Sequence, residues 1–596
     1  MQKLTVCGTG IARFAIVLNP IPDPAEKTAA EFLQRVIETA CGIKLPISAT
    51  AENGIYIGTR EADPRVKWDG FRITTDDKNL YLDGNVPRGT LYAAYDFAEK
   101  YIGYRRFALD CEVIPTEGEG EVPKGLDLVD NPAFEVRRCS WWDSINFTDL
   151  TAYSRLNSSL PHDMTAYGGT VYDFIDCHTY HKYLPAKEYA ESHPEYFALV
   201  NGVRENQEHH QLCLSNPDVL RIVTENVLRE LREHPERTLI DFSQEDGMFG
   251  CTCEHCAAID EEEGSQAGSM IRFVNALAEA VEKEFPHVMI QTFAYEYTTK
   301  PPKKTKAREN VIIRYCTYDA CFRHGIDDPN CAINRETIYQ EMNGWGKMCH
   351  HMSIWDYITN WNCYMAPYPS LISLRENARL FADCHAIHVY GCDSGYHRAG
   401  GVYGDLRAYL YCKTLWNPYM SEEEYNRHMD EFLAAYYGKG WKEIRRYIEF
   451  EHEVTAGRCF TCKEDIDICF AHYVTYPTIP NFKRFFRRNY VAKPYQPVYP
   501  DHALTPMCAR IEEAEAFFDR AYALAETDVE RFHLDRSKMS LAYIRLFCME
   551  HDEFKMNAEE KAAYEAEVKE FYKKMKEYRF AFNLHTEVRD TFSDFQ

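Results

Sequence analysis

Long apolar runs are missing from this sequence. No stretch approaches the roughly 18 consecutive apolar residues that a bilayer-spanning helix needs, so we expect no membrane partner. The first twenty residues, MQKLTVCGTGIARFAIVLNP, are interrupted by Gly, Arg and Asn before they reach the length of a signal-peptide core, which favours a cytoplasmic location. Positive charge is also scarce, because 67 Lys and Arg stand against 92 Asp and Glu. The resulting net charge of −25 argues against nucleic acid as a partner.

Internal repeats and low-complexity tracts are absent as well, which argues against a solenoid. The 596 residues are 45% hydrophobic, 27% charged and 14% aromatic, which is typical of a folded globular protein. At roughly 150 residues per domain, this length predicts three or four units. The sequence leaves open whether the chain forms a homo-oligomer.

The order of the expected elements divides the chain into three domains. Residues 1–127 alternate helix and strand signals and lead into the linker GEGEVPKGLDLVDNPAF, which predicts a small α/β sandwich accessory domain. Residues 134–420 repeat strand and helix units, which predicts an α/β fold of the (β/α)8 TIM-barrel type. Residues 421–596 carry Glu, Lys, Ala and Tyr at helical spacing, which predicts an all-helical domain.

Two adjacent acids follow one of the expected barrel strands. Glu245 and Asp246 lie in Ser243-Gln-Glu-Asp-Gly247, directly after the expected strand Thr238-Leu-Ile-Asp-Phe242. Barrel active sites lie at the carboxyl ends of the strands. Glycoside hydrolysis needs a carboxylic acid for the leaving oxygen and a second group that stabilises the cationic centre, so this pair is a candidate catalytic site. A loop whose acids cap the next helix is the alternative interpretation.

Polar and aromatic side chains recur at other expected strand ends. Aromatic faces stack on sugar rings, so this recurrence favours a carbohydrate pocket and an oligosaccharide partner, although each residue alone is compatible with a structural role. A uronate substrate would need a basic clamp, for which Arg314, Arg323 and Arg398 are candidates. The candidate substrate-binding residues are His178, Tyr295, Glu296, Asp319, Trp355, Asp356 and Tyr357.

Taken together, a series of motifs resembles glycoside hydrolase family 163, formerly a domain of unknown function. The motifs are Leu212-Cys-Leu-Ser-Asn-Pro217, Ser243-Gln-Glu-Asp-Gly247, Cys253-Glu-His-Cys256, Arg272-Phe-Val-Asn275, Thr292-Phe-Ala-Tyr295, Ile354-Trp-Asp-Tyr357, Leu406-Arg-Ala-Tyr409 and Tyr436-Tyr-Gly438. The resemblance covers about residues 135–455 and implies a retaining β-N-acetylglucosaminidase that acts on N-glycan-type oligosaccharides. The helix that starts at Arg88-Gly-Thr-Leu-Tyr-Ala resembles the accessory domain ahead of the barrel in α-glucuronidases and hexosaminidases.

The chain departs from this family pattern at several acids. As the resemblance implies, Asp246 and Asp356 match the pattern. Departures stand at Glu245, Glu296, Asp319 and Cys392-Asp393. A glycosidase for another sugar, such as a hexuronide or galactosaminide, and a catalytically silent carbohydrate-binding protein are therefore the alternatives.

The resemblance to an N-acetylhexosaminidase also suggests roles for the acids. The 2-acetamido oxygen of such a substrate can be the nucleophile, so the protein supplies an acid and orients the acetamide. We expect Glu245 to be the proton donor and Asp246 to orient the acetamido nitrogen, with no cofactor for catalysis. Tyr295, Trp355 and Tyr357 would form the walls of the pocket. The remaining candidates, which would bind hydroxyl groups or serve as alternative catalytic groups, are His178, Glu296, Asp319 and Asp356.

Three cysteines are close together in Cys251-Thr-Cys253-Glu-His-Cys256. With Cys213 they complete the four thiolates of a structural zinc site that would pin the loop after the carboxylate pair. His255 is a substitute ligand in this interpretation. Buried free thiols are the alternative, and they are what we expect for most of the 22 cysteines.

Overall fold

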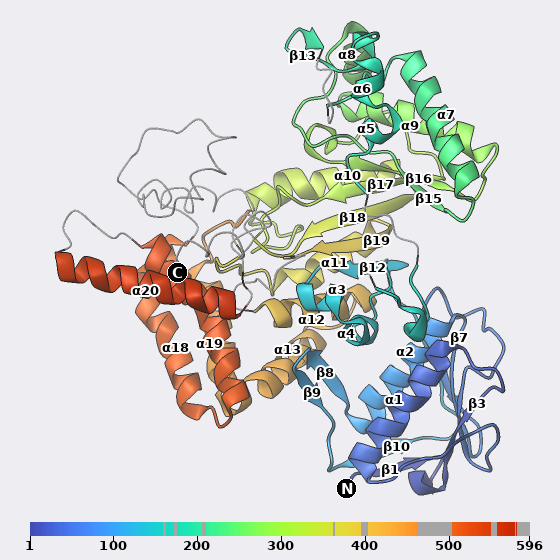
Figure 1. The fold of residues 1–596 in the computed structure, drawn as a ribbon, viewed down its shortest axis with the longest axis vertical. Coiled ribbons are helices and arrows are strands. Elements are labelled where there is room, and N and C mark those ends of the chain that lie inside the picture. Colours follow the sequence, from blue (N-terminus) through green and yellow to red (C-terminus); the bar gives the residue numbers. More distant parts are fainter. Residues whose placement is uncertain are drawn as a thin grey trace.

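A computed structural model of the chain (Figure 1) describes the residues that follow. They are 1–158, 162–171, 176–204, 210–360, 364–394, 403–461, 504–549, 557–578 and 580. None of the described helices combines the length and the hydrophobicity needed to cross a membrane.

The N-terminal part is built on a mixed sheet of six strands with the order β11-β6-β7-β5-β3-β4. Its strands are β3 (Ala15–Leu18), β4 (Ile47–Ser48), β5 (Gly54–Ile57), β6 (Phe71–Thr75), β7 (Leu80–Gly84) and β11 (Asp127–Asp130). Helices α1 (Pro24–Cys41) and α2 (Pro87–Phe97) pack on this sheet and on each other. Helix α1 begins where the Asp23 carboxylate accepts from the Ala25 N–H, and it ends at Gly42, whose φ of +70° suits glycine. A second sheet has the order β10-β1-β2 and consists of β1 (Lys3–Val6), β2 (Thr9–Gly10) and β10 (Glu119–Val122).

The central part is one parallel sheet with the order β12-β19-β18-β17-β16-β15 (Figure 1). Its strands are β12 (Val136–Cys139), β15 (Leu239–Asp241), β16 (Met289–Ala294), β17 (Val311–Cys316), β18 (His351–Tyr357) and β19 (Ala386–Cys392). The connecting helices include α7 (Pro217–Glu233), α9 (Ala267–Glu282), α10 (Tyr339–Met348), α11 (Ser373–Asp383) and α12 (Gly404–Trp416). Alternating strands and helices with parallel pairing confirm the predicted α/β class for this part.

The predicted closed eight-stranded barrel is not found among the described residues. Strands β12 and β15 stay at the two edges of a curled, open sheet. Closure would need two more parallel strands between them in the chain. The described part of this segment instead forms the short helices α3 (Trp142–Asn146), α4 (Thr148–Tyr153), α5 (Tyr180–Tyr183) and α6 (Ala186–Tyr189), and the hairpin β13 (Leu199–Val200) and β14 (Val203–Arg204).

The two faces of the parallel sheet differ because side chains alternate along each strand. One face carries Ile240, Ile290, Ile313 and Ile354, which belong to the main hydrophobic core. The other face carries Asp241, Gln291, Arg314 and Ser353, all buried, and we call it the polar face. On the polar face Gln291 Nε2 donates to Asp241 Oδ2 at 2.9 Å, and Arg314 Nε donates to Ser353 Oγ at 3.2 Å. Buried polar groups in this position suggest a site and not only a core.

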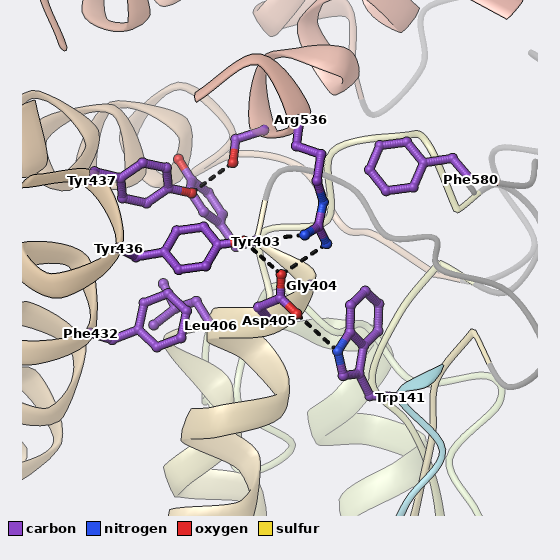
Figure 2. A pocket seen from close by; sticks show the side chains of 11 residues that line it. Trp141, Tyr403, Gly404, Asp405, Leu406, Phe432, Tyr436, Tyr437, Arg536 and Phe580 are labelled. Carbon is purple, nitrogen blue, oxygen red and sulfur yellow. Dashed lines mark hydrogen bonds and ion pairs between the residues drawn. The ribbon is translucent and has the colours of Figure 1, made fainter. Parts of the chain in front are cut away.

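The C-terminal part is helical where it is described. Its helices are α13 (Glu422–Tyr437), α14 (Trp441–Val454), α17 (Thr505–Ala509), α18 (Ile511–Leu524), α19 (Asp528–Tyr543) and α20 (Ala558–Glu577). Figure 2 shows where α19 meets the first turn of α12. Asp405 accepts from Trp141 Nε1 at 3.0 Å, from the Tyr436 hydroxyl at 2.9 Å and from Arg536 Nη2 at 2.9 Å. The cavity beside them is only about 10 Å³ in volume, so this cluster joins three parts of the chain and is not a ligand site.

Candidate functional site

The adjacent acids Glu245 and Asp246 lie in different surroundings. Glu245 is fully buried at the end of the buried run 243–245, whereas Asp246 is exposed. Oε1 of Glu245 accepts from the His181 backbone N–H at 2.9 Å and lies 2.9 Å from His181 Nδ1. The side chain of Gln211 bonds both backbone groups of Glu245, at 3.1 Å and 2.6 Å. Glu245 is therefore held between α5 and Gln211, whereas Asp246 is open to solvent.

Asp246 meets the end of strand β16. The Tyr295 hydroxyl donates to Asp246 Oδ1 at 3.2 Å. Burial, together with the negative charge of Asp246, raises the pKa of Tyr295, so its phenol stays a neutral donor. The ring of His178 lies 6.3 Å from the ring of Tyr295, and its Nδ1 is 2.7 Å from the Gln244 carbonyl oxygen. The structure thus brings His178, Asp246 and Tyr295, three of the candidates from the sequence, close together.

Two residues of this region have a left-handed backbone. His178 has a φ of +58° and Glu296 a φ of +50°. Such conformations are uncommon for residues with a side chain, and they cluster at functional sites because surrounding contacts must impose them. Glu296 is half-buried and opens the short turn Glu296–Thr298 after β16, so its side chain leaves the strand end beside Tyr295.

Aromatic rings form a row along the polar face toward its carboxyl end. The ring of Phe293 lies 6.0 Å from Tyr295 and 6.1 Å from Trp355, and Trp355 lies 4.8 Å from Tyr390. We call Tyr295, Phe293, Trp355 and Tyr390 the aromatic row. The guanidinium of Arg314 lies 5.8 Å from the ring of Trp355, and that of Arg138 lies 5.1 Å from Tyr390. These spacings fall within the range of aromatic and cation–π contacts.

Sequence reasoning missed Phe293, Tyr390 and Arg138. Their signal was the period of two along a strand, because Phe293 is two residues before Tyr295 and therefore shares its face. Tyr390 and Arg138 are themselves paired in the register of β19 and β12. His181 was missed as well, since only the folded chain brings it to Glu245.

Asp241 lies on the polar face below the aromatic row. It accepts from Ser243 Oγ, from Gln291 Nε2 at 2.9 Å and from Thr179 Oγ1 at 3.3 Å. Burial raises the pKa of Asp241 to about 6, against the lowering effect of the Arg314 charge. The buried carboxyl of Asp241 and the buried guanidinium of Arg314 therefore lie beneath the aromatic row.

The other sequence candidates are spread over both faces. Trp355 and Tyr357 share the polar face, and Tyr357 packs edge-on to Tyr318 at 5.1 Å. Asp356, between them, accepts from Thr317 Oγ1 at 2.9 Å and faces Tyr411 of α12. Burial raises the pKa of Asp356 to about 6. The structure does not bring Asp356 to the aromatic row, whereas Asp319 is half-buried in the loop after β17.

The basic residues that were candidates for a uronate clamp lie in different parts of the fold. Arg314 lies on the polar face, as described above. Arg323 instead donates to the His452 carbonyl oxygen at 2.8 Å and to Thr455 Oγ1 at 3.3 Å, so it ties a loop to the end of α14. Arg398 lies outside the described residues.

The predicted thiolate cluster forms in the structure. Cys213, Cys251, Cys253 and Cys256 are buried, and their sulfur atoms all lie within 4.8 Å of one another. Around them, the Leu199 N–H donates to Cys251 Sγ at 3.3 Å, and Arg204 Nη1 lies 3.8 Å from the same sulfur. His255 is exposed and is not part of this cluster. The geometry is that of four ligands around one position, and the cluster closes the loop that carries Glu245 and Asp246.

Comparison with known proteins gives a family and a fold. A family model described as "Domain of unknown function (DUF4838)" matches residues 107–449. No match was found among proteins with curated descriptions. A family GH115 4-O-methyl-α-glucuronidase with specificity for decorated arabinogalactans has a similar structure, with a TM-score of 0.52 and 12% identity over 94% of this chain and 76% of that chain. This likeness shows a shared fold.

Two more solved structures have lower scores. A GH138 enzyme targeting pectin rhamnogalacturonan II has a TM-score of 0.43 and 11% identity over 95% of this chain and 73% of that chain. A mutant β-hexosaminidase of Streptomyces plicatus has a TM-score of 0.40 and 12% identity over 71% of this chain and 90% of that chain.

Proposed function

We propose that this chain, which belongs to the family described as Domain of unknown function DUF4838, is a glycoside hydrolase whose sugar site is the carboxyl end of the polar face. The observation that carries the proposal is the aromatic row, with the Asp246 carboxylate bonded to its first member, Tyr295. Aromatic faces bind the apolar faces of sugar rings, and a carboxylate beside them supplies the charge that glycoside hydrolysis needs. The fold shared with the family GH115 glucuronidase supports the same class of reaction.

For the specific reaction, we propose that the chain is a retaining β-N-acetylglucosaminidase that acts on N-glycan-type oligosaccharides. We also propose that it is a member of glycoside hydrolase family 163. The Asp246 carboxylate would accept a hydrogen bond from the N–H of the substrate's 2-acetamido group. The Tyr295 hydroxyl would hold this carboxylate in place. The acetamido oxygen would then attack the anomeric carbon and form an oxazoline as the leaving oxygen departs. Water would open the oxazoline and restore the acetamide with the original anomeric configuration.

Glu245 is the proposed proton donor in this scheme. Its carboxyl is buried, but His181 Nδ1 lies 2.9 Å from Oε1, and the His181 side chain is 32% exposed. The imidazole therefore connects the buried carboxyl with solvent. A proton passed from Glu245 through this ring to the leaving oxygen would be replaced from water after each turnover.

The test is a panel of chromogenic aryl glycosides. Release of chromophore from the β-N-acetylglucosaminide, with strong inhibition by a thiazoline that mimics the oxazoline, is the expected result. Turnover of the glucosaminide with indifference to the thiazoline, together with covalent labelling by a fluorosugar, would replace the acetamide by a protein nucleophile such as Glu296 or Asp319. Binding without release from any member of the panel would leave a carbohydrate-binding protein.

A hexuronide is the second candidate substrate, because two guanidinium groups lie against the aromatic row. Arg314 is buried beside Trp355, and half-buried Arg138 lies over Tyr390. Guanidinium groups bind carboxylates by paired hydrogen bonds, which a uronate would offer and an N-acetylglucosamine would not. Aryl glucuronides in the same panel decide between the two, and a rise in KM for Arg138→Gln on the glucuronide alone would support this candidate.

We also propose a structural zinc ion at Cys213, Cys251, Cys253 and Cys256. Four thiolates are a common ligand set for structural zinc, and sulfur ligands disfavour Mg²⁺ and Ca²⁺. The Leu199 N–H and the Arg204 guanidinium would offset the negative charge of the thiolates. Thiolate sites persist where cysteines stay reduced, so this proposal agrees with the expected cytoplasmic location.

A further inference from the structure

A second group of sulfur and nitrogen atoms lies away from the aromatic row and from the Cys213 cluster. It consists of Cys321 and His324 in the loop after β17, Cys331 before α10, and Cys459 after α14. Their four ligand atoms all lie within 4.8 Å of one another. Cys321 and Cys331 are buried, and His324 and Cys459 are half-buried. The group joins segments that are 128 residues apart in the chain, as in the pair Cys331 and Cys459.

The distances within this group are those of ligands around one small cation. Cys331 Sγ lies 3.9 Å from Cys459 Sγ, and Cys321 Sγ lies 3.2 Å from His324 Nδ1. Tetrahedral zinc with Zn–S bonds of about 2.3 Å separates two thiolates by about 3.8 Å. The sulfur atoms of a disulfide lie only about 2.05 Å apart, so the 3.9 Å between Cys331 and Cys459 is not a disulfide distance.

The loop that carries these ligands is held by a buried amide. Asn334 is fully buried, and its Oδ1 accepts from the Cys321 N–H at 2.7 Å. Its Nδ2 donates to the carbonyl oxygens of Cys321 at 2.7 Å and of His324 at 3.1 Å. One side chain therefore fixes the backbone at two of the four ligands. Partners of this kind orient metal ligands before the ion binds.

Cys459, the fourth ligand, is held in place by hydrogen bonds of its neighbour Phe460 in the segment after α14. The Phe460 N–H donates to Cys321 Sγ at 3.4 Å, and the Phe322 N–H donates to the Phe460 carbonyl oxygen at 2.8 Å. These two bonds dock the residues after α14 onto the β17 loop and bring Cys459 to Cys331. The Arg323 guanidinium interacts electrostatically with Cys321, Cys331 and Cys459, so a positive charge stands near the three thiols.

We propose that Cys321, His324, Cys331 and Cys459 form a second structural zinc site of the Cys3His type. Three thiolates and an imidazole suit zinc, and the ligand set contains no oxygen for Mg²⁺ or Ca²⁺. Zinc with three thiolates carries one negative charge, which Arg323 offsets. The ion fixes the loop that carries Tyr318 and Asp319 and ties it to the end of α14. Each of the two zinc sites then pins a loop that leaves the carboxyl end of the parallel sheet, one after β15 and one after β17.

The test is elemental analysis of the full chain, prepared in reductant without chelator. We expect two equivalents of zinc in the native protein, one in Cys331→Ser and one in Cys213→Ser. Cys349→Ser, which removes a buried thiol of neither cluster, is the matched control and keeps two. Native protein with a single equivalent that Cys213→Ser abolishes would overturn the second site. So would a Cys331→Ser variant that keeps two equivalents.

A spectroscopic measurement covers the case in which Cys331→Ser does not fold. Cobalt is loaded into Cys213→Ser, where only the proposed second site remains. Tetrahedral d–d bands with thiolate charge-transfer absorption are the expected result, and His324→Cys in the same background should shift these bands while keeping one equivalent of metal. The absence of thiolate bands would overturn the proposal. So would mass spectra that show a Cys331–Cys459 disulfide both in fully oxidised protein and in protein prepared with reductant.

Discussion

The hydroxyl of Tyr295 donates a 3.2 Å hydrogen bond to Oδ1 of Asp246, across 49 residues of sequence. The bond joins the loop after β15 to the end of β16, two neighbouring strands of the parallel sheet. It places the only exposed acid of the Glu245–Asp246 pair at the start of the aromatic row. In the part of the chain that the structure describes, the Tyr295 phenol is the group that orients the Asp246 carboxylate.

We expect Tyr295→Phe to lower kcat by about tenfold or more, because Asp246 loses the donor that orients it and one donor in such a site is worth up to about 10²–10³. The measurement is steady-state turnover of the best aryl glycoside of the panel. Tyr81→Phe is the matched control, since Tyr81 also donates to a carboxylate, Asp76, but in the N-terminal sheet. Equal rates for Tyr295→Phe and Tyr81→Phe would remove the Tyr295 bond from the mechanism.

Glu245→Gln and Asp246→Asn should each lower turnover by at least about a hundredfold, since loss of acid catalysis costs on the order of 10²–10⁴. Their effects on stability should differ. Glu245 is buried and bonded to His181, so Glu245→Gln should also lower the free energy of unfolding, by about 1–3 kcal/mol. Asp246 is exposed, and Asp246→Asn should leave unfolding unchanged.

Denaturant unfolding and turnover, measured on both variants, check this pair of expectations. A Glu245→Gln variant that is destabilised but turns over at the native rate would make Glu245 a structural residue. Near-native turnover of both variants would move the chemistry to Glu296 or Asp319.

How far the sequence predicted the fold depends on the kind of signal each element gives. Strands such as Val311–Cys316 are short, buried and mainly apolar runs between helices, with Arg314 as the one charged member, and this local pattern predicted the parallel sheet. The open edge between β12 and β15 was not predicted, because sheet closure depends on pairing between distant segments. Short polar segments such as Tyr180–Tyr183 carry no local signal that distinguishes a helical turn from a short strand.

The candidate site was predictable where neighbours in sequence are neighbours in space. The close spacing of Cys251, Cys253 and Cys256 predicted their cluster, and Cys213 was recognised from its motif. The second cluster has no such spacing, since Cys459 reaches Cys331 only through the docking of the segment after α14. Asp356 matched a family motif, yet strand alternation turns its side chain toward Tyr411 and away from Trp355.

Asp356 gives a prediction about pH. Burial raises its pKa to about 6 in the folded chain, above its ordinary 3.8, so folding favours the protonated form. Its contribution to stability is therefore fully present below about pH 3 and is lost as the pH rises from there through about 6. The full loss is about 3 kcal/mol, at about 1.36 kcal/mol for each pH unit between the two values.

Asp356→Asn should remove this dependence. The difference in unfolding free energy between the variant and the native protein should change by about 3 kcal/mol between pH 3 and pH 7, in favour of the variant at pH 7. Urea unfolding at several pH values measures it. A difference that stays constant over this range would show that Asp356 titrates as an ordinary carboxyl.

Loss of zinc from the Cys213 cluster should loosen the loop after β15. Cys213→Ser is expected to lower the melting temperature by several degrees, since a structural zinc site contributes to folding directly. A strong chelator removes both proposed zinc ions, so it should lower the melting temperature of the native protein more than Cys213→Ser does, and it should have no effect on the double variant Cys213→Ser, Cys331→Ser. Differential scanning calorimetry with and without chelator checks this, and an unchanged melting temperature for Cys213→Ser would leave only buried thiols at that position.

The ion pair between Asp405 and Arg536 carries the last prediction. Both side chains are 8% exposed, and Asp405 also accepts from Trp141 and Tyr436 (Figure 2). Asp405→Asn would leave the Arg536 guanidinium buried without its counter-charge, which costs about 3–5 kcal/mol in comparable buried pairs. We therefore expect this variant to lower the free energy of unfolding by that amount and to detach α19 from the first turn of α12.

Glu225→Gln, which breaks the exposed pair with Arg221 on α7, is the matched control and should cause no resolvable change, because solvent screens surface pairs. Urea unfolding compares the two variants, and hydrogen exchange of α19 amides shows where the loss occurs. Equal stability of Asp405→Asn and Glu225→Gln would mean that the Asp405–Arg536 ion pair adds nothing measurable to the packing of α19 against α12.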